Sequence, residues 1–197
     1  MIFGPILTKY LLVLSAVLSL FAGGLADVEE SSGTNALEWS PDSLILATAS
    51  EEGQIYLWDE TGTLIKAFDG HEFGSLSIDW SPDGRYIVSG GREGLLKVWN
   101  VAEGSLVQTV NEKHEGDVLS VDWNPVTNQV ASASMNEVFI WDSSSWQQTD
   151  SLGTPFVSAV KWSPDGTHLA VGASVLYLFD SITLEHDGEF TQQEGFI

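Results

Sequence analysis

The sequence contains no cysteine, which excludes disulfide bonds and thiolate-bound metal ions. Positive charge is also scarce, since 7 lysines and arginines stand against 28 aspartates and glutamates, for a formal net charge of −21 at pH 7. A surface of this charge repels nucleic acid and anionic membranes, and it favours cationic partners. We therefore expect no nucleic-acid binding and a preference for basic protein surfaces, with simple solubility as the alternative reason for the acidity.

Motifs for catalysis and ligand binding are missing too. The chain has no Gly-x-Ser-x-Gly and no His-Glu-x-x-His, and the segment SGGREG at 89–94 lacks the lysine of a phosphate-binding loop. Acidic pairs such as Glu51 and Glu52 come without the oxygen-rich loop of a calcium site. We therefore expect no catalytic residue, no metal site and no cofactor, so that the protein is not an enzyme.

The first 26 residues differ in composition from the rest. A lone Lys9 precedes an uncharged, mostly apolar run from Leu11 to Ala26, which ends in small residues. This order predicts a secretory signal peptide, and with it an extracellular or periplasmic location. The run is shorter than the roughly 20 residues that span a bilayer. An uncleaved N-terminal anchor and a mis-joined gene start are the alternatives, the second with a cytoplasmic location.

One phrase recurs through the remaining chain. It reads WSPDS at 39–43, WSPDG at 80–84, WNPVT at 123–127 and WSPDG at 162–166. A second aromatic residue follows each phrase, in the triplets LWD, VWN, IWD and LFD. Self-similarity with a period of about 40 residues indicates a repeat protein.

Each repeat contains short segments typical of β-strands. In the second repeat they are SLSIDW (75–80), YIVSGG (86–91), LLKVW (95–99) and SLVQTV (105–110), bounded by Gly, Pro, Asp and Ser. In the recurring phrase, Pro82 presets φ for a β-turn, Asp83 can bond to nearby backbone, and Gly84 allows a left-handed conformation. No segment has helical periodicity. The sequence therefore predicts an all-β fold with four strands in each repeat.

Four strands for every 40 or so residues, closed by an aromatic–Asp pair, resemble the blade of a WD40 β-propeller. The resemblance covers roughly residues 34–190 and implies an all-β, WD40-type β-propeller of four blades with four antiparallel strands each. A linker at 27–33 and a tail at 191–197 flank repeats at about 34–69, 70–112, 113–153 and 154–190. A WD40 ring usually has seven blades, so we expect an incomplete or open ring whose end blades leave apolar faces uncovered, with self-association as one consequence.

The resemblance also implies a hydrogen-bonded set of His, Ser or Thr, an acid and Trp in each blade. When the set is matched to this sequence, it has three members in the first repeat, four in the second and three in the third, where the acid is undetermined. They are Thr48, Glu52 and Trp58; His71, Ser89, Glu93 and Trp99; and His114, Ser132 and Trp141. Val171 and Phe179 leave the fourth repeat without this set.

In such a propeller the turns between second and third strands, and the loops between blades, share one rim. The resemblance makes this rim the candidate site for a protein partner. Its residues are Glu51, Glu52, Glu72, Phe73, Arg92, Glu93, Lys113, Glu115, Met135 and Asn136.

We therefore expect a non-enzymatic WD40-repeat scaffold for protein–protein interaction. One alternative is a fragment of a larger intracellular protein, because WNPVTNQVASAS and VFIW within 123–141 are similar to a blade of the WD40 subunits of the intraflagellar-transport complex. The other is a propeller enzyme or small-ligand binder that uses the central channel.

Overall fold

Four small β-sheets make up the protein in the computed structural model, which describes residues 33–110 and 114–190. Each sheet has four antiparallel strands in chain order, and we number the sheets as blades 1 to 4. Blades 1 and 2 hold β1 (Thr34–Trp39), β2 (Ile45–Ser50), β3 (Ile55–Asp59), β4 (Leu64–Phe68), β5 (Ser75–Trp80), β6 (Tyr86–Gly91), β7 (Leu96–Asn100) and β8 (Ser105–Thr109). Blades 3 and 4 hold β9 (Ser120–Trp123), β10 (Gln129–Ser134), β11 (Glu137–Asp142), β12 (Gln147–Leu152), β13 (Ala159–Trp162), β14 (His168–Gly172), β15 (Leu176–Asp180) and β16 (His186–Phe190).

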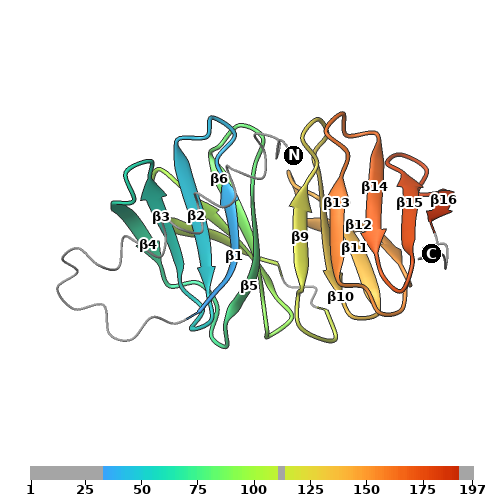
Figure 1. Ribbon diagram of the computed structural model, residues 1–197, viewed down its shortest axis with the longest axis horizontal. Helices are drawn as coiled ribbons and strands as arrows, with labels where there is room; N and C mark the ends of the chain where they lie inside the picture. The colour runs from blue at the N-terminus through green and yellow to red at the C-terminus, as the bar shows by residue number, and fades with distance from the viewer. Residues whose placement is uncertain (1–32, 111–113, 191–197) are drawn as a thin grey trace, which may run out of the picture.

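The blades stack face to face in an open arc (Figure 1). Their first strands, β1, β5, β9 and β13, lie side by side through the middle of the molecule and form a concave inner wall. The last strands of the end blades, β4 and β16, lie at the left and right of the molecule in Figure 1. Contacts join β1 to β5, β5 to β9 and β9 to β13. The predicted architecture, four blades of four antiparallel strands in an open ring, is confirmed.

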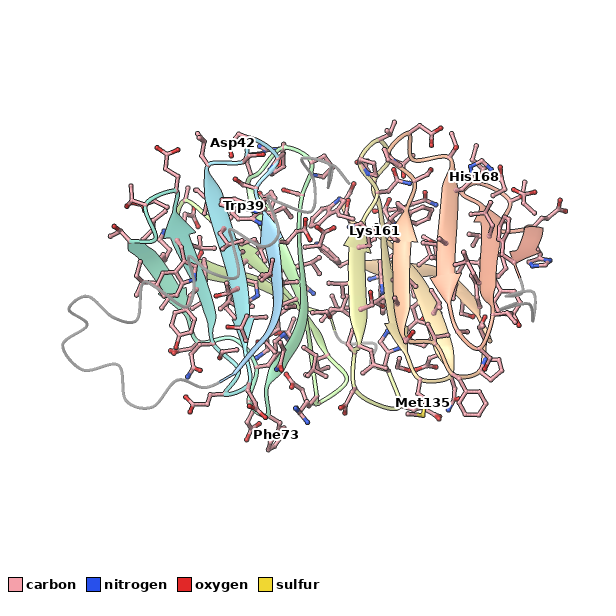
Figure 2. All side chains as sticks on the ribbon, viewed as in Figure 1. Trp39, Asp42, Phe73, Met135, Lys161 and His168 are labelled. Atoms are coloured by element: carbon pink, nitrogen blue, oxygen red, sulfur yellow. The ribbon has the colours of Figure 1, made fainter. Side chains whose placement is uncertain are left out.

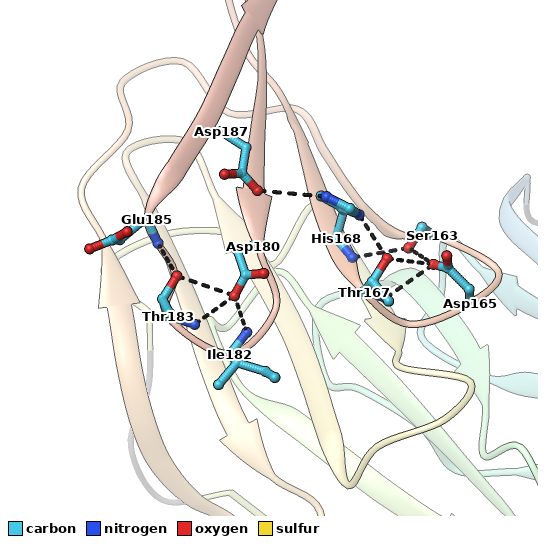
Figure 3. A network of polar contacts seen from close by, with 9 residues as sticks. All are labelled: Ser163, Asp165, Thr167, His168, Asp180, Ile182, Thr183, Glu185 and Asp187. Carbon is cyan, nitrogen blue, oxygen red and sulfur yellow. Dashed lines mark hydrogen bonds and ion pairs between the residues drawn. The ribbon is translucent and has the colours of Figure 1, made fainter.

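The recurring phrase forms the turn between the first two strands of a blade. In blade 2, Ser81 Oγ donates to Asp83 Oδ1 at 2.7 Å, and the same oxygen accepts from Arg85 N at 3.0 Å. Gly84 closes the turn with a φ of 70°. Blade 4 repeats the arrangement with Ser163 and Asp165 at 2.6 Å (Figure 3). Side chains within five residues therefore fix this turn, which explains why it can be read from the sequence.

The Asp of the aromatic–Asp pair closes a second turn, between the third and fourth strands. Asp180 Oδ1 accepts from the backbone N of Ile182 at 2.9 Å and of Thr183 at 2.8 Å (Figure 3). Asp59 and Asp142 serve the equivalent turns of blades 1 and 3 in the same way. Because the aromatic residue is directed into the sheet stack while the Asp closes the turn, the pair marks the end of each third strand.

The hydrophobic core is divided into three clusters, one between each pair of neighbouring blades. Between blades 1 and 2 the buried side chains are Ala47, Ala49, Ile55, Leu57, Phe68, Ile78, Trp80, Ile87 and Trp99. Equivalent clusters lie between blades 2 and 3 and between blades 3 and 4. Each blade therefore depends on its neighbours to keep its apolar faces dry.

Within residues 33–110 and 114–190, no helix is long and apolar enough to span a membrane. The N-terminal segment 1–26, for which the sequence predicts a signal peptide or anchor, lies outside the described residues, as does the tail 191–197.

Candidate functional site

His71 holds blade 2 together from the loop that precedes β5. Its Nε2 lies 2.8 Å from Ser89 Oγ on β6, and its Nδ1 lies 2.5 Å from Glu93 Oε1 in the turn before β7. Trp99 Nε1 donates to the same Ser89 Oγ at 3.0 Å. Burial alone would raise the pKa of Glu93, but the hydrogen bond and charge of His71 lower it below its ordinary value. The four residues that the resemblance implied are thus in contact.

Blade 3 contains the same network with a different acid. His114 Nε2 lies 2.7 Å from Ser132 Oγ, which accepts from Trp141 Nε1 at 2.8 Å, and His114 Nδ1 lies 3.0 Å from Glu137 Oε1. The acid of this blade could not be assigned from the sequence because the turn before β11 is shorter, and in the structure it is Glu137. Burial lowers the pKa of His114, which favours the neutral ring.

The end blades have less of the network. In blade 1, Trp58 Nε1 donates to Thr48 Oγ1 at 3.0 Å, whereas Glu52 is exposed on the β2–β3 turn. The placement of Glu52 in the network was therefore wrong: without a histidine in this blade, nothing draws its carboxylate inward. In blade 4, Val171 and Phe179 are buried in the apolar cluster shared with blade 3.

Ser89, His71 and Glu93 have the connectivity of a hydrolase triad, but their burial prevents that use. Ser89 is 0% exposed and accepts the indole N–H of Trp99, so a substrate carbonyl cannot reach its hydroxyl. Ser132 in blade 3 is equally buried and accepts from Trp141. The two networks are structural, since they join the entering loop, second strand and third strand of each blade.

Most residues predicted for the rim do lie along one edge of the arc, the lower edge in Figure 2, where Phe73 and Met135 are labelled. Backbone hydrogen bonds assemble this end: His71 N donates to Gly53 O at 2.8 Å, and Val157 N donates to Met135 O at 2.8 Å. These bonds tie each β2–β3-type turn to the loop that enters the next blade.

The rim is acidic with a few exposed apolar side chains. Phe73 is 61% exposed and Met135 58%. The other exposed predicted residues are Glu51, Glu52, Glu72, Arg92, Glu115 and Asn136. Glu93 is half-buried against His71, so it belongs to the network rather than to the surface, and Lys113 lies outside the described residues.

Phe156 is a rim residue that the sequence analysis missed. It is 66% exposed and has a positive φ of 61°, in the loop between β12 and β13. It follows Thr154 by two positions, as Phe73 follows His71, and this spacing is the signal that could have identified it.

A charged cluster on the concave wall was also missed. The residue before the first Trp of each blade is Glu38, Asp79, Asp122 or Lys161. Asp79 Oδ2 accepts from Trp123 N of the next blade at 2.5 Å, and Asp122 Oδ2 accepts from Trp162 N at 2.6 Å. Lys161 Nζ forms an ion pair with Asp122 Oδ1. These residues therefore link successive blades along the inner wall.

Burial governs the acidity of this cluster. Desolvation, followed by the charge of Asp122, raises the pKa of Asp79 to about 7, and desolvation also raises that of Asp122 despite its ion pair with Lys161. The two carboxyls lie close enough for the charge of Asp122 to disfavour ionisation of Asp79. In the described part of the chain no group of three or more His, Cys, Asp or Glu side chains could hold a metal ion.

A groove of about 640 Å³ lies between blades 2 and 3 on their outer side. Trp146, the tryptophan outside the repeat pattern, lines it and packs edge-on against Trp123, with ring centroids 5.6 Å apart. The polar lining of the groove includes serine, threonine, asparagine and glutamine side chains together with the Asp83–Arg85 ion pair, and it contains no histidine.

Comparison with known families places four matches along the chain. The family described as "WD domain, G-beta repeat" matches residues 27–59, 62–100, 104–142 and 146–175. The second match runs from β4 through β7, so the repeating sequence unit begins one strand before the blade that it completes.

Relatives among characterised proteins are distant and much longer. The chain is 28% identical to the rat (Rattus norvegicus) "Intraflagellar transport protein 80 homolog" over 137 residues, which cover 68% of this chain and 17% of that relative. It is 35% identical to an Arabidopsis thaliana "Guanine nucleotide-binding protein subunit beta" over 81 residues, 38% of this chain and 22% of the relative. The chain thus spans less than a quarter of these relatives.

A solved structure shares the fold. The "Structure of U3-55K" superimposes with a TM-score of 0.75 at 18% identity, covering 85% of this chain and 54% of that one. At this identity the likeness concerns the fold alone.

Proposed function

Because the chain belongs to the WD40-repeat family, we propose that it is a non-enzymatic scaffold that binds other proteins through the rim described above. The WD40 repeats and the relatives support protein interaction in general. The observation that carries the proposal is the set of exposed apolar side chains, Phe73, Met135 and Phe156, on a rim that backbone hydrogen bonds hold in place. Exposed apolar groups on a rigid scaffold, bordered by charge, are typical of a protein interface.

The partner of the rim has a basic surface. Glu51, Glu52, Glu72 and Glu115 surround the apolar side chains, against a single described cation, Arg92, among the predicted rim residues. Complementary charge accelerates association and selects among partners, and its contribution weakens as salt increases. The uncovered faces of blades 1 and 4 are a second interaction surface, used for self-association.

The rim proposal can be tested by capture from cell extract with three forms of the chain. The rim variant carries Phe73→Ala, Met135→Ala and Phe156→Ala. The matched control carries Leu44→Ala, Val126→Ala and Ile182→Ala, which remove apolar groups 55%, 67% and 87% exposed from turns at the opposite end of the blades.

We expect the wild type and the control to capture a basic partner, and the rim variant to capture at least tenfold less of it. Quantitative mass spectrometry measures the amount of captured partner. Recovery should also fall when salt rises from about 0.05 to 0.5 M, since the Debye length shrinks several-fold over that range. Equal recovery by all three forms would overturn the proposal.

A second candidate function follows from one relative. The match to the intraflagellar transport protein covers 68% of this chain, which supports a scaffold that serves as part of a larger transport assembly. Under this reading the chain acts inside the cell, in contrast to the location that the apolar N-terminal segment predicts. N-terminal sequencing of the protein from its own cells separates the two: an intact Met1 supports the intracellular assembly, and cleavage after Ala26 contradicts it.

A further inference from the structure

In the described residues, each of the three apolar contacts between neighbouring blades joins the same two kinds of face. The first is named the aliphatic face after its alanine, isoleucine and leucine side chains, although a phenylalanine completes it. In blade 1 it consists of Ala47, Ala49, Ile55, Leu57 and Phe68. The second is a tryptophan face on the following blade, which in blade 2 consists of Ile78, Trp80, Ile87 and Trp99. All of these side chains are at most 5% exposed. Blades 2 and 3, and blades 3 and 4, pair in the same order.

Blade 4 presents an aliphatic face with nothing packed on it among the described residues. Its register repeats that of blade 1: Ala170 pairs with Leu178 and Gly172 with Leu176, as Ala47 pairs with Leu57 and Ala49 with Ile55. Phe190 then pairs with Leu176 as Phe68 pairs with Ile55. Leu176 is 41% exposed and Phe190 57%, whereas their counterparts Ile55 and Phe68 are 0% and 3% exposed.

Blade 1 presents the complementary tryptophan face. Trp39 pairs with Leu46 and Leu46 with Trp58, as Trp80 pairs with Ile87 and Ile87 with Trp99 in blade 2. Trp39 is 36% exposed and its neighbour on the same face, Leu37, is 37% exposed. Their counterparts in blade 2, Trp80 and Ile78, are 4% and 5% exposed. The chain therefore has one uncovered face of each kind, at opposite ends of the arc.

Charge complementarity on the inner wall matches the same docking. Within the chain, the residue before the Trp of one blade interacts with its counterpart in the next, since the charge of Asp122 acts on Asp79 and Asp122 forms an ion pair with Lys161. The charge of Lys161 already acts on Glu38 of its own chain, where it opposes the effect of burial on the pKa of that carboxyl. If blade 1 of a second copy followed blade 4, Lys161 would stand beside Glu38 of that copy as well. An ammonium and a carboxylate would meet at this position.

A specific hydrogen bond is also available to the docked pair. Trp80 Nε1 donates to Glu38 O of the preceding blade at 3.1 Å, and Trp162 Nε1 donates to Asp122 O at 3.2 Å. The equivalent donor in blade 1 is Trp39, for which the described residues provide no acceptor. In the docked copies it would reach the carbonyl oxygen of Lys161.

We propose that two copies of the chain close one eight-bladed ring, in which the aliphatic face of blade 4 in each copy covers the tryptophan face of blade 1 in the other. The two contacts are identical and head-to-tail, and they close by twofold rotation about the ring axis. Eight blades lie within the range of known propellers. The inference deepens the proposed scaffold function, on which it rests, by identifying the end blades as a self-association surface distinct from the rim.

Light scattering on the full chain at 1 to 100 μM tests the proposal. We expect the mass of a dimer. Leu176→Asp places a charge on the aliphatic face and Trp39→Glu places one on the tryptophan face, and each should raise the dissociation constant at least 100-fold. Val126→Asp is the matched control, because Val126 is 67% exposed in a turn away from both faces and should leave the dimer intact. Circular dichroism and the Tm of each variant establish that it is folded.

Cross-linking tests the register independently of stability. Phe68 packs against Trp99 with ring centroids 5.6 Å apart, so Phe190 of one copy should meet Trp58 of the other. Because the chain has no cysteine, the double variant Phe190→Cys, Trp58→Cys has thiols only at these positions. A short bismaleimide should join two such chains, and it should join far fewer chains that carry Leu176→Asp in addition.

Three results would overturn the proposal: a monomer at 100 μM, a dimer that survives both face substitutions, or a series of masses above two copies, which would indicate open filaments. The rim experiment gives a separate answer, since the rim variant should still dimerise and Leu176→Asp should still capture the rim partner. Failure of one proposal can therefore be told from failure of the other.

Discussion

His71 and Glu93 lie 2.5 Å apart through Nδ1 and Oε1, although His71 belongs to the loop before β5 and Glu93 to the turn before β7. The histidine also reaches Ser89 on β6, so one buried ring joins three successive segments of blade 2. Blade 3 repeats this bracing with His114, and blade 1 has only a Thr–Trp pair. The networks of blades 2 and 3 should therefore contribute more to the free energy of unfolding than the Thr–Trp pair of blade 1.

Ser89→Ala measures the contribution of this network. The substitution leaves the indole N–H of Trp99 and one His71 nitrogen without their buried partner, so we expect the free energy of unfolding to fall by about 2 to 4 kcal/mol. Thr48→Val in blade 1 removes a single, partly exposed bond and should cost about 0.5 to 1 kcal/mol. Urea denaturation of both variants checks the difference, and equal losses would contradict the role of the histidine.

Asp79 should make stability depend on pH. Its pKa is raised to about 7 in the folded chain, from an ordinary value of 3.8. Between about pH 4 and 7 the folded chain therefore keeps a proton that the unfolded chain has released, and the free energy of unfolding falls as pH rises. Above the folded pKa both states are ionised and this contribution stays constant.

Asp79→Asn isolates the effect, because the amide oxygen can still accept from Trp123 N while the titration is removed. Relative to the wild type, the variant should gain about 1.4 kcal/mol between pH 4 and 8 for each unit by which the pKa of Asp79 is raised. Asp83→Asn is the control, since the pKa of Asp83 is lowered and its titration falls below this window. If the urea midpoints of the wild type and Asp79→Asn changed equally with pH from pH 4 to 8, the raised pKa would be refuted.

Ser43→Gly should stabilise the first turn. Ser43 has a φ of 61°, whereas the equivalent positions of blades 2 and 4 are occupied by Gly84 and Gly166 with φ of 70° and 71°. A left-handed conformation costs a residue with a Cβ about 1 to 2 kcal/mol, and glycine avoids this cost. Glycine also makes the unfolded chain more flexible, which offsets part of the stabilisation. We expect the free energy of unfolding to rise by about 0.5 kcal/mol, while Gly84→Ser should lower it, both followed by thermal denaturation.

The sequence was sufficient for features that depend on neighbouring residues. The turns at Ser81–Gly84 and after Asp180 close through side chains within five residues, so their phrases predicted the strand ends and, through their period, the four blades. The networks of His71 and His114 followed from family resemblance. Glu137 did not, because a shorter turn changes its spacing and only the folded hairpin shows that its carboxylate reaches His114.

Tertiary structure alone decided which surfaces remain open and which charges meet. Asp79 and Trp123 are 44 positions apart, and their contact exists only because blade 2 stacks on blade 3. The same stacking buries Ile55 but leaves its counterpart Leu176 uncovered, although both are aliphatic residues at equivalent strand positions. Local turn chemistry is encoded within a few residues, whereas burial and the pKa values that follow from it depend on whether another blade is present to exclude water.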